Sequence, residues 1–517
     1  MQCLGPFRRA QQALLIAVVI LGGCGGGGNS QSGTATYPPP RGTLLQSPPQ
    51  LLSTLTASNL LLELNAAPNQ QLLAIGVPPI CDILIYHIEY ETVGGANEAT
   101  SASGALMVPT GLGANCTGSR PIVLYAHGTT TDRTFDMTNM QNPESLTLAA
   151  LFASQGYIVV APNYAGYDTS SLAYHPFLIA DQQSKDMIDA LRAARTALPY
   201  ASLTLTRDDG RLFITGYSEG GYVAMATHRA MQAAGMTVTA AAPMSGPYAL
   251  AAFVDAIFSG EVNNGAPVSS TLLFTAYQHA YGNIYASSVD VFESQYSGGI
   301  DDLLPSTIPR SQLYADGKLP EFALFSATPP AASLAALTPA TAPADLAAVF
   351  ALGFGAGNLL QNSFRLAYLE DAEANPDGGW PTLSSGVTAA RPQLAARQAF
   401  ATNDLRNWAP TSPVLLCGGA LDPTVFWFNT QLLQDYFTAH APPSASIAVL
   451  DLESEATGND PYANLKTGFA IAKDLIAAAA VAQGANDGGA SAVSEAYHDT
   501  LVPPFCTAAV RAFFAAR

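Results

Sequence analysis

The sequence predicts an α/β fold, with a mostly parallel β-sheet flanked by helices. Two observations support this prediction. Short apolar runs with strand character alternate with helical runs along most of the chain, and this alternation is typical of parallel sheets. In addition, a glycine-rich turn joins an apolar run directly to a helical run, within residues 212–225. We find no internal repeat in the 517 residues.

The expected elements begin with an antiparallel hairpin formed by residues 83–93 and 102–108. Further strands are expected at 121–126, 157–161, 212–215, 238–243, 414–417 and 446–451, with helices at 144–154, 182–197, 220–234 and 424–437. The alternation stops between residues 247 and 408. We therefore expect a core formed by residues 51–246 and 409–517, and a large, mainly helical cap formed by residues 247–408. The cap would lie over the active site, because loops at the carboxyl ends of parallel strands surround it.

The cap is unusually poor in charge. Between Glu321 and Arg365 the only charged residue is Asp345. Helical runs at 334–337 and 346–354 could present an apolar face to a bound chain-like molecule, or could form the core of the cap itself. A large cap implies an enclosed pocket in either case, and this favours small or chain-like molecules over folded proteins as ligands.

The turn in the middle of the chain has the pattern of a nucleophile elbow. It reads Gly216-Tyr217-Ser218-Glu219-Gly220, after the apolar run 212–215 and before the helical run that starts at residue 222. So sharp a reversal forces Ser218 into a strained conformation with its hydroxyl exposed. Gly216 and Gly220 remove side chains that would collide in the turn. We therefore expect Ser218 to be a catalytic nucleophile.

A serine hydroxyl needs a base, and the base needs an orienting acid. In enzymes with this elbow, the acid and then the histidine follow the serine along the chain. Four histidines follow Ser218. His228 lies on the helix after the elbow, His279 lies in the cap, and His440 ends a helical run. His498 lies in an expected polar loop before the last helical run, so we predict that it is the base.

The acid is expected after the strand at residues 414–417. Asp422 follows this strand and precedes Pro423, which we expect to open a helix. Asp422 could instead only cap that helix, but its position favours the role of the catalytic acid. Asp499 would need an unusual turn to face the neighbouring imidazole. Asp451 and Asp460 lie beyond the following strand and are weaker candidates.

An oxyanion hole requires two donors near the nucleophile. One should be the backbone N–H of Glu219, directly after the serine. The other should come from the loop after the strand at 121–126, which reads His127-Gly128-Thr129-Thr130. We expect Thr129 to supply this second donor, and His127 to be structural.

These motifs together resemble those of the α/β-hydrolase esterases and lipases. The elbow 216–221, the loop 127–130, the strand end 161–167 and the large insertion before Asp422 are similar to those of secretory lipases of the lipase-A-like family. The resemblance extends from about residue 80 to the C-terminus. It implies an α/β-hydrolase fold, hydrolysis of carboxylic esters and no cofactor.

The N-terminus has the features of a targeting segment. Arg8 and Arg9 precede a short apolar run at 13–21, and the sequence Leu21-Gly22-Gly23-Cys24 follows. This pattern resembles a bacterial lipobox, which implies cleavage of residues 1–23 and lipidation of Cys24; an ordinary signal peptide is the alternative. Residues 24–50 are rich in Gly, Ser, Gln and Pro and should form a flexible tether. We therefore expect an exported, outer-membrane lipoprotein, held to the membrane only by its lipid anchor.

Four cysteines remain in the expected mature chain. An even number in an oxidising compartment favours disulfides, although four buried free thiols are the alternative. Of the three possible pairings we favour Cys81–Cys116, across the first hairpin, with Cys417–Cys506. The second bridge would tie the strand before Asp422 to the segment after His498.

Charge and composition limit the possible partners. The formal net charge is −18, which argues against binding to nucleic acid or to anionic lipid. We find no metal-ligand spacing and expect no cofactor. The sequence therefore predicts a serine esterase or lipase acting on a small-molecule or lipid ester. A serine peptidase and a non-catalytic binding lipoprotein on the same fold remain as alternatives.

Overall fold

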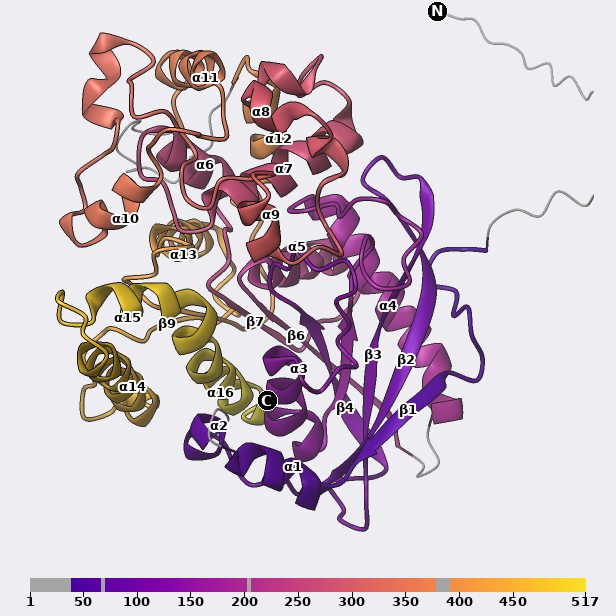
Figure 1. Cartoon of the computed structure of the whole chain (residues 1–517). Coiled ribbons are helices and arrows are strands. Elements are labelled where there is room, and N and C mark those ends of the chain that lie inside the picture. The colour runs from indigo at the N-terminus through magenta and orange to yellow at the C-terminus, as the bar shows by residue number, and fades with distance from the viewer. Residues whose placement is uncertain (1–38, 67–69, 202–205, 378–390) are drawn as a thin grey trace, which may run out of the picture. The chain divides into compact units, whose positions relative to one another are not determined.

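The computed structural model describes residues 39–66, 70–201, 206–377 and 391–517 (Figure 1). The expected signal peptide and Cys24 lie outside the described residues. None of the helices in the described part of the chain has the length and apolar character needed to span a bilayer.

A nine-stranded sheet forms the centre of the molecule, in the order β1-β2-β3-β5-β4-β6-β7-β8-β9. The strands β1, β2, β3 and β5 pair antiparallel, and all pairs from β5 through β4 to β9 are parallel. The prediction of a mostly parallel sheet that opens with an antiparallel hairpin is therefore confirmed. The strands are β1 (Gln50–Leu55), β2 (Asp82–Val93), β3 (Ala99–Thr110), β4 (Ser119–Ala126), β5 (Ile158–Pro162), β6 (Arg207–Tyr217), β7 (Ala240–Met244), β8 (Val414–Gly418) and β9 (Ile447–Asp451).

Helices cover both faces of this sheet, because its central strands are apolar on both sides. In β4, Leu124 points to the face covered by α4 and α5, and Val123 points to the face covered by α3 and α16 (Figure 1). The helices are α1 (Ala57–Asn65), α2 (Gln70–Ile75), α3 (Pro143–Leu151), α4 (Ala180–Ala201), α5 (Glu219–Ala233), α6 (Leu250–Phe258), α7 (Ala266–Tyr281), α8 (Ser294–Ser297), α9 (Arg310–Ala315), α10 (Ala347–Leu352), α11 (Asn362–Ala374), α12 (Ala395–Asn403), α13 (Phe428–His440), α14 (Ala463–Ala482), α15 (Ala490–Ala496) and α16 (Val502–Ala515).

The expected tether comprises residues 24–50, of which residues 24–38 lie outside the described residues and residues 39–50 are attached to the fold. Arg41 forms an ion pair with the buried Asp189 at 2.8 Å, and the Gly42 N–H donates to the Glu91 carbonyl at 2.7 Å. The composition of residues 39–50 resembles that of a linker, but these contacts fix the segment against β2 and α4.

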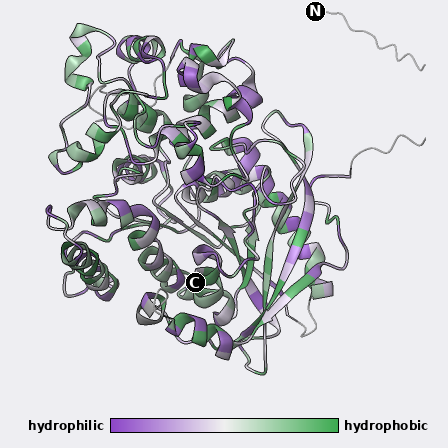
Figure 2. Ribbon diagram, viewed as in Figure 1, coloured by the Kyte–Doolittle hydropathy of each residue, from purple (hydrophilic) through white to green (hydrophobic). Residues whose placement is uncertain are grey.

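Between β7 and β8, the described residues contain α6 to α12, and these helices lie within the range 247–408 in which we expected an insertion. The insertion has its own aromatic core, in which Phe258 stacks on Tyr368 with ring centroids 3.8 Å apart. Its two apolar runs lie at the edge of this core, against which Leu334, Leu337, Leu346 and Phe354 pack as partly buried side chains. Figure 2 shows that α10 is largely hydrophobic, yet only Phe350 is buried in it, and no residue is buried in the 3₁₀-helix Ala332–Leu337.

Candidate active site

Ser218 lies in a strained turn between β6 and α5. Its backbone has φ 57° and ψ −122°, a conformation that non-glycine residues rarely adopt. A Cβ atom on Gly220 would lie 1.9 Å from the Ala126 carbonyl oxygen, and a Cβ on Gly216 would lie 2.3 Å from the Gly220 carbonyl oxygen. Glycine is therefore required at both positions, as the sequence predicts.

The structure brings Ser218, His498 and Asp422 into one hydrogen-bonded chain. The imidazole Nε2 of His498 lies 2.8 Å from the Ser218 hydroxyl, and its Nδ1 lies 2.7 Å from Asp422 Oδ2. His498 and Asp422 are 3% and 1% exposed, respectively. The serine, the imidazole and the carboxylate come from three separate segments, so only the fold assembles them. This arrangement allows the imidazole to remove the serine proton while the carboxylate fixes its orientation.

Asp422 lies in a loop rather than at a helix start. Its Oδ1 accepts the backbone N–H groups of Thr424 at 2.9 Å and Val425 at 3.0 Å, which leaves Oδ2 for His498. The helix that we expected at Pro423 begins only at Phe428. The expectation was wrong because Asp422 forms a local turn with the residues after the proline.

His498 lies in a helix rather than in the expected polar loop. It belongs to a π-helix, Tyr497–Leu501, between α15 and α16. Single π-helical turns are frequent at functional sites. The Tyr217 hydroxyl donates to the His498 carbonyl oxygen at 2.5 Å and thereby ties this turn to the elbow. Pro503 and Pro504 do not interrupt the helix that follows, because prolines are tolerated in the first turn of α16.

The pKa of His498 reflects two opposing effects. Burial lowers it, but the charge of Asp422 and its hydrogen bond outweigh burial, and Asp499 adds to them, so the pKa is raised above its ordinary value. A raised pKa makes the imidazole a stronger base once it is neutral.

The expected oxyanion donors belong to two segments, the start of α5 and the loop after β4. Glu219 is the first residue of α5, and N–H groups in the first turn of a helix have no partner within the helix. Gly128 lies beside the nucleophile, since a Cβ atom built on it would be 3.8 Å from Ser218 Cβ. The Gly128 N–H donates to Glu144 at 3.0 Å. The next amide is that of Thr129, which is exposed.

Sequence reasoning missed the buried hydrogen bonds made by the side chains of Glu219 and Glu144. The buried Glu219 Oε1 accepts His175 Nε2 and Gln183 Nε2, each at 2.6 Å. Glu144 was noted only as the start of a helix. Its sequence context, Asn142-Pro143-Glu144, indicates an ordinary helix N-terminus, and no sequence signal connects it with Gly128.

A second missed group joins the histidine to the acid loop. The Tyr497 hydroxyl donates to Glu453 Oε1 at 2.8 Å and lies 3.4 Å from the backbone N of Leu421. A Cβ atom on Gly419 would come within 2.3 Å of this hydroxyl, so only glycine allows the approach. Tyr497 precedes His498 and Leu421 precedes Asp422, so this contact links the two halves of the triad.

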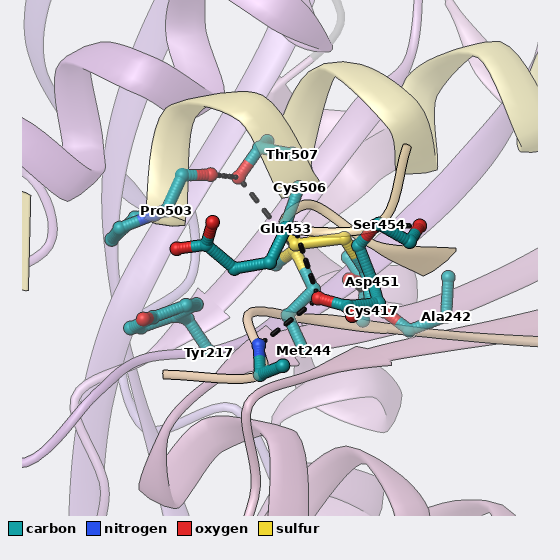
Figure 3. The surroundings of a disulfide bond; sticks show 12 residues. Tyr217, Ala242, Met244, Cys417, Asp451, Glu453, Ser454, Pro503, Cys506 and Thr507 are labelled. Carbon is teal, nitrogen blue, oxygen red and sulfur yellow. Dashed lines mark hydrogen bonds between the residues drawn. A yellow bond between two sulfur atoms is a disulfide. The ribbon is translucent and has the colours of Figure 1, made fainter. Parts of the chain in front are cut away.

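Both expected disulfides are present. Cys81 is bonded to Cys116 beside the first hairpin, and Cys417 to Cys506. Figure 3 shows the second bridge joining β8 to α16, with Thr507 and Met244 beside it. This bridge therefore fixes the strand before Asp422 to the helix after His498.

The insertion is attached to loops on two sides of Ser218. On one side, Ser306 exchanges backbone hydrogen bonds with the loop after β4: its N–H donates to Thr131 at 2.8 Å and its carbonyl accepts Arg133 at 2.9 Å. On the other side, Asn264 donates to the Pro423 carbonyl at 2.9 Å, directly after Asp422. The insertion therefore reaches both the expected oxyanion loop and the acid loop.

The other histidines that the sequence analysis considered, His127, His228, His279 and His440, lie on the expected segments. Burial lowers the pKa of His127 to about 4, and the ring stacks on Tyr164 with centroids 4.1 Å apart. His228 lies on α5, His279 lies in the insertion on α7, and His440 ends α13.

The other candidate acids are also engaged elsewhere. Asp451 accepts the N–H of Ala420 at 3.0 Å, and Asp460 forms an ion pair with Lys466. Asp499 is exposed. Asp422 is thus the candidate acid that the structure pairs with His498.

One group of side chains within the described residues could hold a metal ion, although we expected none. It comprises His87, Asp136 and Asp168, whose ligand atoms lie within 4.8 Å of one another. His87 Nε2 already lies 2.8 Å from Asp168 Oδ2, which also accepts the Ser103 hydroxyl at 2.6 Å. Burial lowers the pKa of His87, but the bond to Asp168 and its charge outweigh burial and raise it. These contacts describe an ion pair.

Comparisons with known proteins agree with this fold. The family model of the prolyl oligopeptidase family matches residues 144–265. The structure of a rice cell wall degrading esterase, LipA from Xanthomonas oryzae, matches with a TM-score of 0.65 and 26% identity, over 93% of this chain and 100% of that chain. A putative hydrolase from Legionella pneumophila matches with a TM-score of 0.58 and 20% identity, over 79% and 91%. No curated protein sequence matches.

The chain therefore has the α/β-hydrolase fold, and both kinds of match support a serine hydrolase. The narrower resemblance to lipase-A-like secretory lipases stays a prediction.

Proposed function

We propose that this protein is a serine carboxylic ester hydrolase, with Ser218 as nucleophile, His498 as base and Asp422 as orienting acid. The observation that carries the proposal is the continuous chain of contacts, 2.8 Å and 2.7 Å, from the strained serine through the imidazole to the carboxylate. Such a chain activates a hydroxyl that is otherwise a weak nucleophile.

In the first half of the reaction, Ser218 Oγ attacks the ester carbonyl while its proton moves to His498 Nε2. The N–H groups of Glu219 and Thr129 stabilise the oxyanion of the tetrahedral intermediate. The C–O bond to the alcohol then breaks, and His498 returns the proton to the departing oxygen. The product of this half is an acyl ester on Ser218.

Water completes the cycle. His498 takes one proton from water as its oxygen attacks the acyl carbonyl, and a second tetrahedral intermediate forms. The bond to Ser218 breaks, the serine oxygen recovers the proton, and the carboxylic acid leaves. Asp422 remains ionised throughout and stabilises the imidazolium.

Two observations bear on the choice between ester and amide substrates. The similarity to an esterase extends over 93% of this chain, which favours an ester. The peptidase family model matches only residues 144–265, a segment that contains the elbow but neither His498 nor Asp422. A serine peptidase is thus the second candidate. The insertion, through its contacts with both active-site loops, supports a covered pocket for a small or chain-like ester.

The test begins with a fluorophosphonate probe, which labels activated serines. We expect one adduct, which peptide mapping assigns to Ser218, and no adduct in Ser218→Ala. p-Nitrophenyl butyrate should be hydrolysed, and Ser218→Ala should lose roughly 10⁴-fold or more in kcat. Unchanged ester turnover in Ser218→Ala would contradict the proposal. Faster cleavage of alanyl p-nitroanilide than of the ester would favour the peptidase.

We further propose that the protein is exported and lipid-anchored through Cys24. Disulfides persist in oxidising compartments, and the described residues contain two. Palmitate labelling of cells that produce the protein should mark the wild type and not Cys24→Ala. Equal labelling of both would contradict the anchor without affecting the catalytic proposal.

A further inference from the structure

Glu144 connects three elements next to the nucleophile. One carboxyl oxygen, Oε1, accepts the Tyr125 hydroxyl at 2.6 Å and the Gly128 N–H at 3.0 Å. Tyr125 belongs to β4, Gly128 to the loop after it, and Glu144 to the first turn of α3, which is capped by Asn142. A single side chain therefore fixes the start of the loop relative to the strand and the helix.

This loop is the one expected to complete the oxyanion hole. Gly128 lies between Glu144 and the nucleophile, since a Cβ atom built on it would be 3.8 Å from both Glu144 Oε1 and Ser218 Cβ. The Gly128 N–H already donates to Glu144 and is not available to substrate. The next amide along the loop is that of Thr129, the donor expected from the sequence.

The groups that most affect the pKa of Glu144 include no cation. Burial raises the pKa of Glu144 to about 7; the bonds from Tyr125 and Gly128 oppose this shift, whereas the charges of Glu219 and Asp499 add to it. The pKa of Tyr125 is itself raised well above 10, by burial and by Glu144, so its hydroxyl stays a donor. A negative charge close to a developing oxyanion would oppose catalysis. The useful property of Glu144 is therefore its accepting oxygen rather than its charge.

We propose that Glu144 is a positioning residue for the oxyanion hole: its carboxyl oxygen holds Gly128 so that the Thr129 N–H faces the oxygen that becomes negative beside Ser218. The inference rests on the proposed ester hydrolase function. It predicts that loss of the accepting oxygen affects the transition state and leaves substrate binding unchanged, because the ground-state carbonyl needs the oxyanion donors less.

The test compares Glu144→Ala with Glu144→Gln, which keeps an accepting oxygen without the charge. With p-nitrophenyl butyrate at pH 8, we expect Glu144→Ala to lower kcat by roughly 10- to 100-fold, with KM within about twofold; loss of a complete oxyanion donor costs on the order of 10²–10³. Glu144→Gln should restore kcat to within about threefold of wild type. Glu455→Ala, at an exposed glutamate, is the matched control and should leave kcat unchanged.

A trifluoromethyl ketone provides a readout that a general loss of stability does not change. It forms a hemiketal with the active serine, whose oxygen occupies the oxyanion hole. Its Ki should rise in Glu144→Ala by the same factor by which kcat/KM falls, and should recover in Glu144→Gln. If Glu144→Ala does not fold, Tyr125→Phe provides the test, because it removes the other group that orients the carboxyl; we expect about a 3- to 10-fold change in both kcat/KM and Ki.

The outcomes separate this inference from the proposed function. If wild type and Ser218→Ala hydrolyse the ester equally, the proposed function itself fails. If wild type depends on Ser218 but Glu144→Ala has wild-type kcat and Ki, Glu144 has no positioning role. An increase in KM alone, or a glutamine variant as impaired as the alanine variant, would also overturn the inference.

Discussion

Replacing Glu144 by glutamine should stabilise the protein at alkaline pH. The pKa of this carboxyl is raised by burial from 4.5 to about 7. A folded-state pKa above the unfolded value means that the folded protein binds the proton more tightly. The contribution of Glu144 to the free energy of unfolding is therefore greatest below pH 4.5 and is lost as pH rises through 7. At 1.36 kcal/mol for each pH unit between the two values, the loss reaches at most about 3 kcal/mol above pH 8. Glutamine resembles the neutral carboxyl and should not suffer this loss.

The assay is urea unfolding of wild type and Glu144→Gln with disulfides intact, followed by tryptophan fluorescence between pH 4 and 9. The difference in the free energy of unfolding between the two proteins should change by about 2–3 kcal/mol from pH 4.5 to pH 8.5, in favour of glutamine at the higher pH. Glu455→Gln, at the exposed control site, should show no such change. A difference that is constant with pH, or that favours wild type at pH 8.5, would refute the assignment of a buried, titrating carboxyl.

Three further predictions concern the triad. Because the base must be neutral, kcat/KM should rise with pH through a pKa above 6.5. Asp422→Asn removes the partner that raises the pKa of His498, so it should move this rise to lower pH and reduce kcat roughly 10⁴-fold. If the rise in kcat/KM stays at the same pH in Asp422→Asn, the titrating group is not His498. Replacing both Cys417 and Cys506 by alanine removes a bridge between residues 89 positions apart. In the chain-entropy model this should lower the free energy of unfolding, measured by urea unfolding, by about 4–5 kcal/mol. A loss below about 1 kcal/mol would show that non-covalent packing is sufficient to hold β8 and α16 together. Tyr497→Phe removes the bond to Glu453 but keeps the ring and should lower kcat several-fold with little change in KM; a wild-type kcat would show that the disulfide alone orients the two loops.

The sequence predicted the parts of this site that depend on local geometry. The elbow could be recognised because glycine at 216 and 220 is a steric requirement of the turn itself, and the structure shows the carbonyls that a Cβ atom would strike. The mostly parallel sheet could be predicted from alternating apolar and helical runs, because each run is recognisable from its local sequence alone. The order of serine, acid and histidine then limited the candidates to a few positions.

Contacts between distant segments could not be predicted in this way. Glu144 has the sequence context of a helix start, and its bond to Gly128 exists only because α3 packs beside β4. Tyr497 and Gly419 approach one another across 78 residues of chain. His498 was expected in a loop because polar residues surround it, but packing of α15 and α16 makes that stretch helical. In each case, tertiary packing determines a contact or a backbone conformation that the local sequence does not specify.

The attachment of Ser306 to the loop after β4 has a consequence for substrate size. The two hydrogen bonds on Thr131 and Arg133 follow Thr129 by only a few residues. Under the proposed mechanism, a bulky ester that pushed the insertion outward would therefore also pull on the amide that we propose as an oxyanion donor. Binding of a larger ester and the rate of the chemical step would then be linked through this loop. An engineered enlargement of the pocket by displacing the insertion would slow the chemical step, whereas shortening side chains inside a stationary insertion would admit larger acyl groups without this penalty.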